Sequence, residues 1–254
     1  MYIQKIEGFN IEFTGLSREF ILSKLNSKKL NIVITVNAEI VIIANEDTKF
    51  KGILRDSITT IDGQIPYLFL RMKYPKMQFE KLPGSELIYY ICEECSKRSL
   101  KVFLLGTSKT ANRLARIKLK RMYPRLKITG YSPPFLDYPF PQDVNSCILS
   151  KIESFRPDVL FVAFGPPKQE MWLYNNRERL ESLGLRIAVG VGGALNMVAG
   201  IEKRAPKLVQ NIGLESVWRL IQNPKRAKRF IRNFKFFKYV FCLHYMLFTV
   251  LYSH

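Results

Sequence analysis

Two groups of residues between positions 159 and 206 have the types that small-ligand sites use. The first is the segment 165–170 (GPPKQE), which supplies an ammonium, an amide and a carboxylate directly after an apolar run. The second group consists of Gly190, Gly192, Gly193, Asn196 and Arg204. Glycines let a ligand approach the backbone closely, and arginine binds phosphate through a planar fork of donors. The chemistry expected is therefore recognition of a small polar or anionic ligand.

A plainer interpretation of the same residues stays open at this point. Glycine-rich loops after strands are often only tight turns, and a single GxGG pattern is weak evidence for a ligand. Gln169 and Glu170 also suit a helix start, where the helix dipole favours negative charge.

The elements around these groups predict where they lie. Residues 159–164 form a continuous apolar run, as in a strand buried on both faces, and residues 186–189 form a second such strand. Between them, residues 168–183 have helical spacing, and Gly184 follows where a helix commonly ends. Ligands of open parallel sheets bind beyond the carboxyl ends of the strands. We therefore expect both groups at one edge of a sheet.

The rest of the chain alternates between the same two kinds of element. Further strands are predicted at 31–36, 57–61, 101–105 and 127–130, and short edge strands at 2–3 and 11–13. Helices are predicted at 17–26, 38–45, 50–56, 67–73, 84–97, 110–122 and 143–155. This alternation predicts an α/β fold with a doubly wound, mainly parallel sheet of the Rossmann-like kind.

Composition limits the classes of partner. The 254 residues carry a formal net charge of +19, which favours nucleic acid, an anionic membrane surface or phosphorylated substrates as partners. Cys92 and Cys95 form a CxxC inside a predicted helix, and a zinc site would need a second ligand pair. We expect buried or free thiols in a reducing cytosol, and residues 1–15 do not have the pattern of a secretory signal.

The C-terminal segment differs from the rest in its charge pattern. Residues 219–238 contain eight lysines and arginines and no acidic residue. Five large apolar side chains interleave with the basic ones at 230–237, and residues 239–252 are nearly all apolar. That run is shorter than the roughly 20 residues of a spanning helix. A basic amphipathic helix at an anionic membrane surface is the interpretation favoured. Packing of this segment on the sheet domain and a nucleic-acid arm are the alternatives, and the apolar tail argues against nucleic acid. The expected domains are a core at 1–205 and an appendage at 206–254.

The ordered motifs resemble the WecG/TagA/CpsF family of bacterial glycosyltransferases over roughly residues 31–229. The matching motifs are Thr35-x-Asn37, Asp62-Gly63, Leu104-Leu105-Gly106, Tyr123-Pro124, the 165–170 segment, Gly190-x-Gly192-Gly193, Gly200, Arg204-Ala205-Pro206, Gly213-Leu214-Glu215 and Arg219-Leu220. Each motif is weak alone, whereas the ordered set is specific.

The resemblance implies an inverting transfer of a sugar, of the N-acetylmannosamine type, from a UDP-sugar to an undecaprenyl-diphosphate-linked saccharide. The enzyme would act at the cytoplasmic membrane face, as a peripheral protein, in the synthesis of cell-surface polysaccharide. The family lacks a DxD metal motif, and this sequence also has none, so no metal or other cofactor is expected. Self-association as a homo-oligomer is left open.

The resemblance also implies roles for single residues. Asp62 matches the general base, which takes the proton of the acceptor hydroxyl. Thr35, Asn37 and Gln169 match polar groups that hold the sugar. Stabilisation of the diphosphate would come from three arginines of the appendage, Arg219, Arg226 and Arg229. The nucleotide would lie near Gly106, Gly190, Gly192, Gly193 and Arg204.

Local alternatives and departures stand beside these roles. Asp62 would equally suit an Asx turn, and Thr35 and Asn37 would suit helix caps. Arg226 and Arg229 could belong only to the basic run. Lys81 stands where the family often has an arginine, so this side chain keeps the charge without the fork. Family members often have GLEW where this chain has Gly213-Leu214-Glu215-Ser216.

Two other classes of function compete with the transferase. The first is a nucleotide-binding scaffold of a polysaccharide assembly complex, which would bind UDP without turnover. The second is a nucleic-acid-binding protein, which only the net charge favours.

Overall fold

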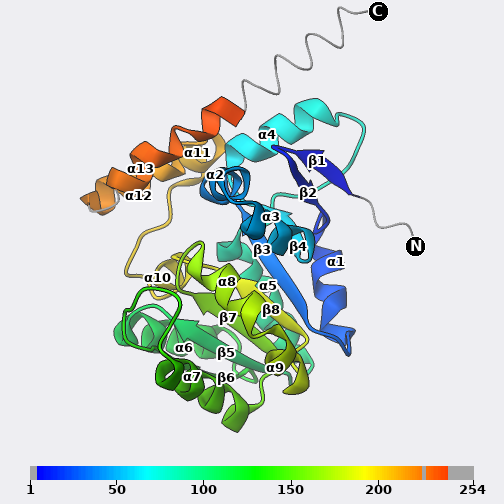
Figure 1. The fold of residues 1–254 in the computed structure, drawn as a ribbon. Coiled ribbons are helices and arrows are strands. Elements are labelled where there is room, and N and C mark those ends of the chain that lie inside the picture. The colour runs from blue at the N-terminus through cyan, green and yellow to red at the C-terminus, as the bar shows by residue number, and fades with distance from the viewer. Residues whose placement is uncertain (1–4, 225–226, 240–254) are drawn as a thin grey trace, which may run out of the picture.

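The computed structural model describes residues 5–224 and 227–239, and a six-stranded parallel sheet lies at its centre (Figure 1). The strands are β3 (Asn31–Val36), β4 (Ile58–Ile61), β5 (Lys101–Gly106), β6 (Lys127–Tyr131), β7 (Val159–Ala163) and β8 (Ile187–Gly190). Their order across the sheet is β4-β3-β8-β7-β5-β6. The predicted doubly wound parallel sheet is therefore confirmed.

Strand register brings the chemistry-bearing segments to one edge. Val36 of β3 pairs with Ile61 of β4, and Ile34 of β3 pairs with Gly190 of β8. Gly190 in turn lies beside Val162 of β7. The loops that follow β3, β4, β7 and β8 therefore leave the sheet at nearly the same level, as ligand sites of such sheets require.

Helices cover both faces of the sheet, and the direction of each crossover determines the face. One face carries α2 (Ala38–Glu46), α3 (Thr48–Arg55), α7 (Gln142–Phe155), α8 (Lys168–Asn175) and α9 (Arg177–Ser182). The other carries α1 (Arg18–Ser23), η1 (Lys24–Asn26), α5 (Gly84–Lys97), α6 (Lys109–Met122) and α10 (Ala194–Val198). Connections that step toward β4 lie on the first face and the step from β5 to β6 on the second, as right-handed crossovers demand.

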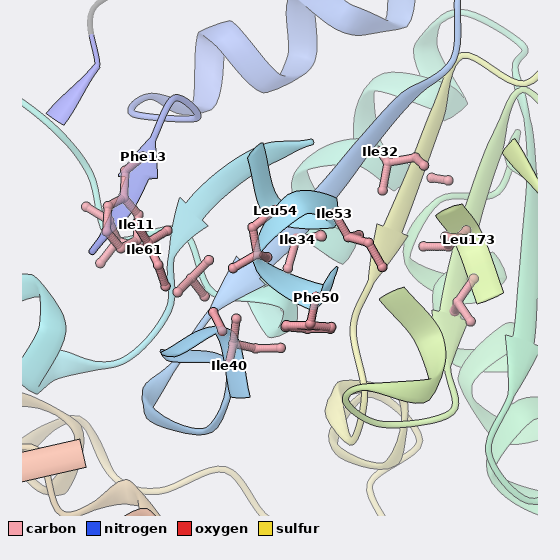
Figure 2. Packing of buried hydrophobic residues seen from close by; sticks show 14 of the residues in the cluster. Ile11, Phe13, Ile32, Ile34, Ile40, Phe50, Ile53, Leu54, Ile61 and Leu173 are labelled. Carbon is pink, nitrogen blue, oxygen red and sulfur yellow. The ribbon is translucent and has the colours of Figure 1, made fainter. Parts of the chain in front are cut away.

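The core on the first face joins the sheet to α3 and α8. Figure 2 shows Phe50, Ile53 and Leu54 of α3 beside Ile34 of β3, with Leu173 of α8 nearby. Strand residues alternate between the two cores, because successive side chains of a strand point to opposite faces. Cys92 and Cys95 lie in the second core as free thiols, and burial raises the pKa of Cys95 to about 12.

A hairpin precedes the sheet. Strands β1 (Ile6–Gly8) and β2 (Ile11–Phe13) pair in antiparallel fashion. Phe9 and Asn10 turn the chain, with φ values of 56° and 62°. The expected strand at 11–13 is confirmed, whereas residues 2–3 lie outside the described residues. The buried Phe9 ring lies against Phe69 of α4 (Gln64–Lys73), with ring centroids 4.8 Å apart.

The single helix expected at 168–183 is wrong, since α8 and α9 are separate helices. Asn176 lies between them, and its side-chain amide donates to the Trp172 carbonyl at 2.8 Å. Its side-chain oxygen accepts from Asn145 of α7 at 3.1 Å. Asparagine competes for local backbone groups in this way, which favours helix ends over helix interiors.

The C-terminal segment contains α11 (Lys207–Asn211), α12 (Glu215–Gln222) and α13 (Ala227–Asn233), so the single basic helix expected there is also wrong. Pro224 follows α12 by two residues and cannot continue a helix without losing a hydrogen bond. We call residues 206–239 the appendage. Figure 1 shows its helices beside α2 and α4. None of the helices in 5–224 and 227–239 is long and apolar enough to cross a membrane.

The appendage packs on the α/β core, as one of the alternatives from the sequence had it. Arg232 pairs with Glu39 of α2, and Lys235 pairs with Glu46 at 3.0 Å. Phe236 is only 2% exposed, and its ring centroid lies 5.1 Å from that of Phe9. This aromatic side chain therefore belongs to the protein core.

Candidate active site

A cleft runs along the carboxyl edge of the sheet as three adjoining cavities. We name them after one residue each: the Asp62 cavity of about 150 Å³, the Gln169 cavity of about 50 Å³ and the Gly106 cavity of about 570 Å³. The first two share Asn37, Asp62, Glu215 and Arg219. The last two share Gly192 and Gly193. The cleft thus links the end of β4 to the ends of β5 and β6.

Asp62 follows β4 directly, where its amide donates to the Val36 carbonyl at 2.9 Å. Gly63 adopts a φ of +107° and turns the chain into α4, a conformation that glycine adopts without strain. In the described part of the chain no group donates a hydrogen bond to the Asp62 carboxylate, so the Asx turn is not formed.

The environment of Asp62 suits a proton acceptor. Burial and the nearby Glu215 carboxylate raise the pKa of Asp62 to about 7, although Arg219 and Lys81 oppose the rise. Low dielectric and like charge both favour the neutral acid. A base whose pKa is close to the working pH takes a proton efficiently.

Thr35 and Asn37 lie at the end of β3 and line the Gln169 cavity. The Thr35 hydroxyl donates to the Gly190 carbonyl at 3.3 Å. The Asn37 side-chain oxygen accepts from the amides of Glu39 and Ile40, at 3.0 and 3.2 Å, so it caps α2. The capping alternative therefore holds for Asn37, yet residues 5–224 and 227–239 offer its amide nitrogen no acceptor.

Gln169 joins two loops of the cleft. Its side-chain oxygen accepts from the amides of Gly165 and Gly192, at 3.1 and 3.0 Å. Its side-chain nitrogen donates to Glu170 at 2.7 Å, and Gln169 itself is 4% exposed. The amide is largely engaged by the protein, so Gln169 holds the loops after β7 and β8 in register.

Close approach explains the glycines of these loops. A Cβ atom at Gly190 would lie 2.9 Å from Gln169 Nε2, and one at Gly193 would lie 2.7 Å from Arg219 Nη2. Gly192 has a φ of +49°. Gly106 has a φ of +96°, and a Cβ there would lie 2.9 Å from the Ala163 carbonyl. Glycine at 190 and 193 therefore makes room for two side chains of the cleft.

The cations of the site are mostly paired. Lys81 donates to Gln64 at 2.8 Å, and Arg204 pairs with Glu86. Both line the Asp62 cavity, so Arg204 lies with the base rather than with the glycine loop. Arg226 lies outside the described residues, and the side chain of Arg229 is not described.

Arg219 reaches the centre of the cleft from α12. Its guanidinium lies 3.4 Å from Glu202. Glu202 also accepts from Asn196 at 3.4 Å, and the Asn196 side-chain oxygen accepts from the Thr107 hydroxyl at 2.6 Å. This network spans the cleft from the end of β5 to α12.

Sequence reasoning missed Glu215 as a site residue, although its motif carried the resemblance. Glu215 is the first residue of α12 and lines the same two cavities as Asp62. Its signal in the sequence was its place as the one acidic residue in positions 206–254.

Metal ligands do not cluster among the described residues. No three of their His, Cys, Asp or Glu side chains form a group that could hold a metal ion. Metal independence stays a prediction.

Comparisons with known proteins show the family of this chain. The chain is 29% identical over 217 residues to the N-acetylglucosaminyldiphosphoundecaprenol N-acetyl-beta-D-mannosaminyltransferase of Bacillus subtilis, covering 85% of this chain and 79% of that protein. The enzyme of the same name from Staphylococcus aureus strain MRSA252 is 30% identical, with 82% and 78% covered. The family model described as "Glycosyl transferase WecG/TagA/CpsF family" matches residues 6–248. This chain belongs to the WecG/TagA/CpsF family of glycosyl transferases.

Proposed function

We propose that this protein transfers an N-acetylmannosamine-type sugar from a UDP-sugar to N-acetylglucosamine linked to undecaprenyl diphosphate, with inversion and without a metal ion. The names of the Bacillus and Staphylococcus relatives support the sugar and the lipid-linked acceptor. The observation that carries the proposal is Asp62, a carboxylate with a raised pKa in a cleft that also holds Arg219.

The reaction needs one base and one stabilised leaving group. The acceptor hydroxyl oxygen forms a bond to the anomeric carbon while the bond from that carbon to UDP breaks. The proton of the hydroxyl passes to Asp62, and the electron pair of the broken bond leaves with UDP. A single displacement of this kind inverts the configuration at the anomeric carbon.

Arginine and lysine would take the place of a metal at the diphosphate. Arg219 lies beside Gly193, between the Gln169 cavity and the network of Glu202. Lys81 also lines the Asp62 cavity. Fixed cations in a partly buried cleft stabilise developing negative charge more than they would in water. The larger Gly106 cavity, lined by Thr107 and Ser108, has room for the nucleoside.

The appendage is proposed as the contact with the inner face of the cytoplasmic membrane. Its exposed apolar side chains are Leu208, Ile212, Leu214, Ile221, Ile231, Phe234 and Phe237. Lys228, Arg232, Lys235 and Lys238 lie among them in sequence. Exposed apolar groups among cations suit an interface with anionic lipid.

UDP release by the purified protein tests the proposal. A panel of UDP-sugars is incubated in EDTA with and without a short-chain GlcNAc-diphosphate-lipid, and Asp62→Asn is run beside the wild type. We expect acceptor-dependent release from the N-acetylmannosamine donor and a loss of about 100-fold or more in Asp62→Asn. UDP binding without release on any acceptor would instead favour the scaffold, and release only after added divalent metal would contradict metal independence.

A further inference from the structure

Glu215 brings a second carboxylate to the base from a distant part of the sequence. Glu215 and Asp62 are 153 positions apart, yet both line the Asp62 cavity and the Gln169 cavity. In the part of the chain that the structure describes, no side chain or amide donates a hydrogen bond to either carboxylate. Among the described residues, two acidic groups therefore share a cleft with no hydrogen-bond donor on either carboxylate.

The placement of Glu215 depends on how α12 docks. At its start, Gly213 adopts a φ of +78°, and a Cβ there would lie 3.1 Å from Ile65 of α4. At its end, the Gln222 side-chain oxygen accepts from the Lys203 amide at 2.8 Å, and its nitrogen donates to the Lys203 carbonyl at 2.8 Å. The helix is thus packed against α4, which begins two residues after Asp62, and hydrogen-bonded to the segment that precedes α11.

Among the described residues, the charges that act most on Asp62 come from three segments. α12 contributes Glu215 and Arg219, the segment before α5 contributes Lys81, and α5 contributes Glu86. Glu39 and Arg204 also line the Asp62 cavity, but each is paired, with Arg232 and Glu86 respectively. Of the acidic groups, Glu215 raises the pKa of Asp62 most.

We propose that Glu215 is the positioning residue of the base: its carboxylate, which the docking of α12 brings into the cleft, stabilises protonated Asp62 against the opposing cations Arg219 and Lys81, so that Asp62 is a stronger proton acceptor with Glu215 in place than without it. When the acceptor hydroxyl loses its proton to Asp62, the neutral acid lies beside the Glu215 charge instead of two charges facing each other. The appendage would in this way couple its closure to the strength of the base. The inference rests on the proposed function, because it gives Asp62 the role of base.

Carbon-13 NMR titration of the Asp62 carboxyl in the full chain tests this coupling without requiring turnover. The signal is assigned by its absence in Asp62→Asn. In Glu215→Gln we expect the Asp62 titration midpoint to fall by roughly one pH unit, since a like charge has been removed. Glu215→Asp should restore much of the shift. The matched control is Glu178→Gln, which removes an exposed carboxylate on α9 and should leave the midpoint unchanged.

The pH dependence of kcat/KM is a second, independent test of the proposal. In Glu215→Gln, the midpoint of the acidic limb of kcat/KM should move down with the NMR midpoint, and the rate on the alkaline plateau should fall roughly threefold, as expected for a weaker base. An unmoved midpoint in Glu215→Gln would overturn the proposal, whatever the activity. A moved midpoint in a protein that transfers no sugar would leave the coupling intact and contradict the proposed function.

Discussion

The side-chain oxygen of Gln169 accepts a hydrogen bond from the Gly192 amide at 3.0 Å, which joins the loop after β7 to the loop after β8. The same oxygen accepts from Gly165 at 3.1 Å. Because Gly190 leaves no Cβ in the way, the amide of Gln169 fits against the backbone at the edge of the sheet. The family resemblance implies that Gln169 holds the sugar, and in this structure its side-chain oxygen joins the two loops that line the cleft.

Gln169→Ala should lower both stability and activity. The substitution leaves the amides of Gly165 and Gly192 without an acceptor, and an unsatisfied donor costs about 1–3 kcal/mol when buried and less when partly buried, as these two are. We expect a lower midpoint of thermal unfolding and a loss of at least about tenfold in kcat/KM. Gln169→Glu is the control, since it keeps the acceptor but places a like charge beside Glu170. A midpoint of thermal unfolding in Gln169→Ala equal to that of the wild type would contradict the role of Gln169 in joining the two loops.

Asp62→Asn should stabilise the fold at alkaline pH while it abolishes proton transfer. The folded-state pKa of about 7 lies above the ordinary value of 3.8, so the folded protein disfavours the charged form. Stability contributed by the neutral acid is present below pH 3.8 and is lost as pH rises through 7. The unfolding midpoint of Asp62→Asn should exceed that of the wild type at pH 8, and the difference should shrink toward pH 4. Thermal unfolding across this range checks the sign.

The same pKa sets the pH dependence of transfer. Asp62 must be deprotonated to accept a proton, so kcat/KM should rise with pH through about 7 and then level off. A profile that is flat between pH 5.5 and 8.5 would contradict the assignment of Asp62 as the base.

Lys81→Met should move that profile toward alkaline pH. The ammonium of Lys81 opposes the rise of the Asp62 pKa, so its removal favours the protonated acid. We expect the midpoint of kcat/KM to rise by up to about one pH unit. Lys81→Arg keeps the positive charge and places it on a planar fork of donors, so its midpoint should stay near that of the wild type. Equal pH profiles for Lys81→Met and the wild type would contradict the effect of Lys81 on the Asp62 pKa.

Much of the fold and part of the site follow from local sequence. Continuous apolar runs predict β3, β5 and β7, because strands buried on both faces need no polar alternation. Strand ends then place Asp62 and Asn37 at one edge. These features depend on neighbours in the chain, and the sequence carries them directly.

What the sequence could not predict depends on contacts between distant segments. Glu215 reaches Asp62 only through the docking of α12, and Phe236 becomes a core residue only because the hairpin presents Phe9. Aromatic side chains in a basic segment have the same spacing in the sequence whether they contact lipid or pack against a hairpin of the same chain. The break at Asn176 likewise depends on Asn145 from another helix.

Phe236→Ala should release the appendage without unfolding the sheet. Removing a buried phenylalanine costs about 3–5 kcal/mol, and here the lost packing includes the contact with Phe9 by which the appendage joins the core. We expect faster tryptic cleavage at Lys228, Arg232 and Lys235, weaker transfer and little change in the main unfolding midpoint. Phe237→Ala, at a neighbouring residue that is 39% exposed, is the control. Equal cleavage rates in both variants would contradict the docking role of Phe236.

Exposed apolar residues of the appendage should decide membrane binding. Ile231 and Phe234 are 67% and 56% exposed and lie among cations of α13 and the residues after it. The double variant Ile231→Ser/Phe234→Ser keeps every charge but loses apolar contact with the acyl boundary, so co-sedimentation with anionic liposomes should fall severalfold. Ile117→Ser/Met122→Ser is the matched control, because both residues are exposed on α6, which is also basic. If the α6 variant lost binding and the α13 variant kept it, the membrane would contact the surface of α6 instead of the appendage. Unchanged binding in both variants would mean that charge alone, distributed over the whole surface, attracts the protein to lipid.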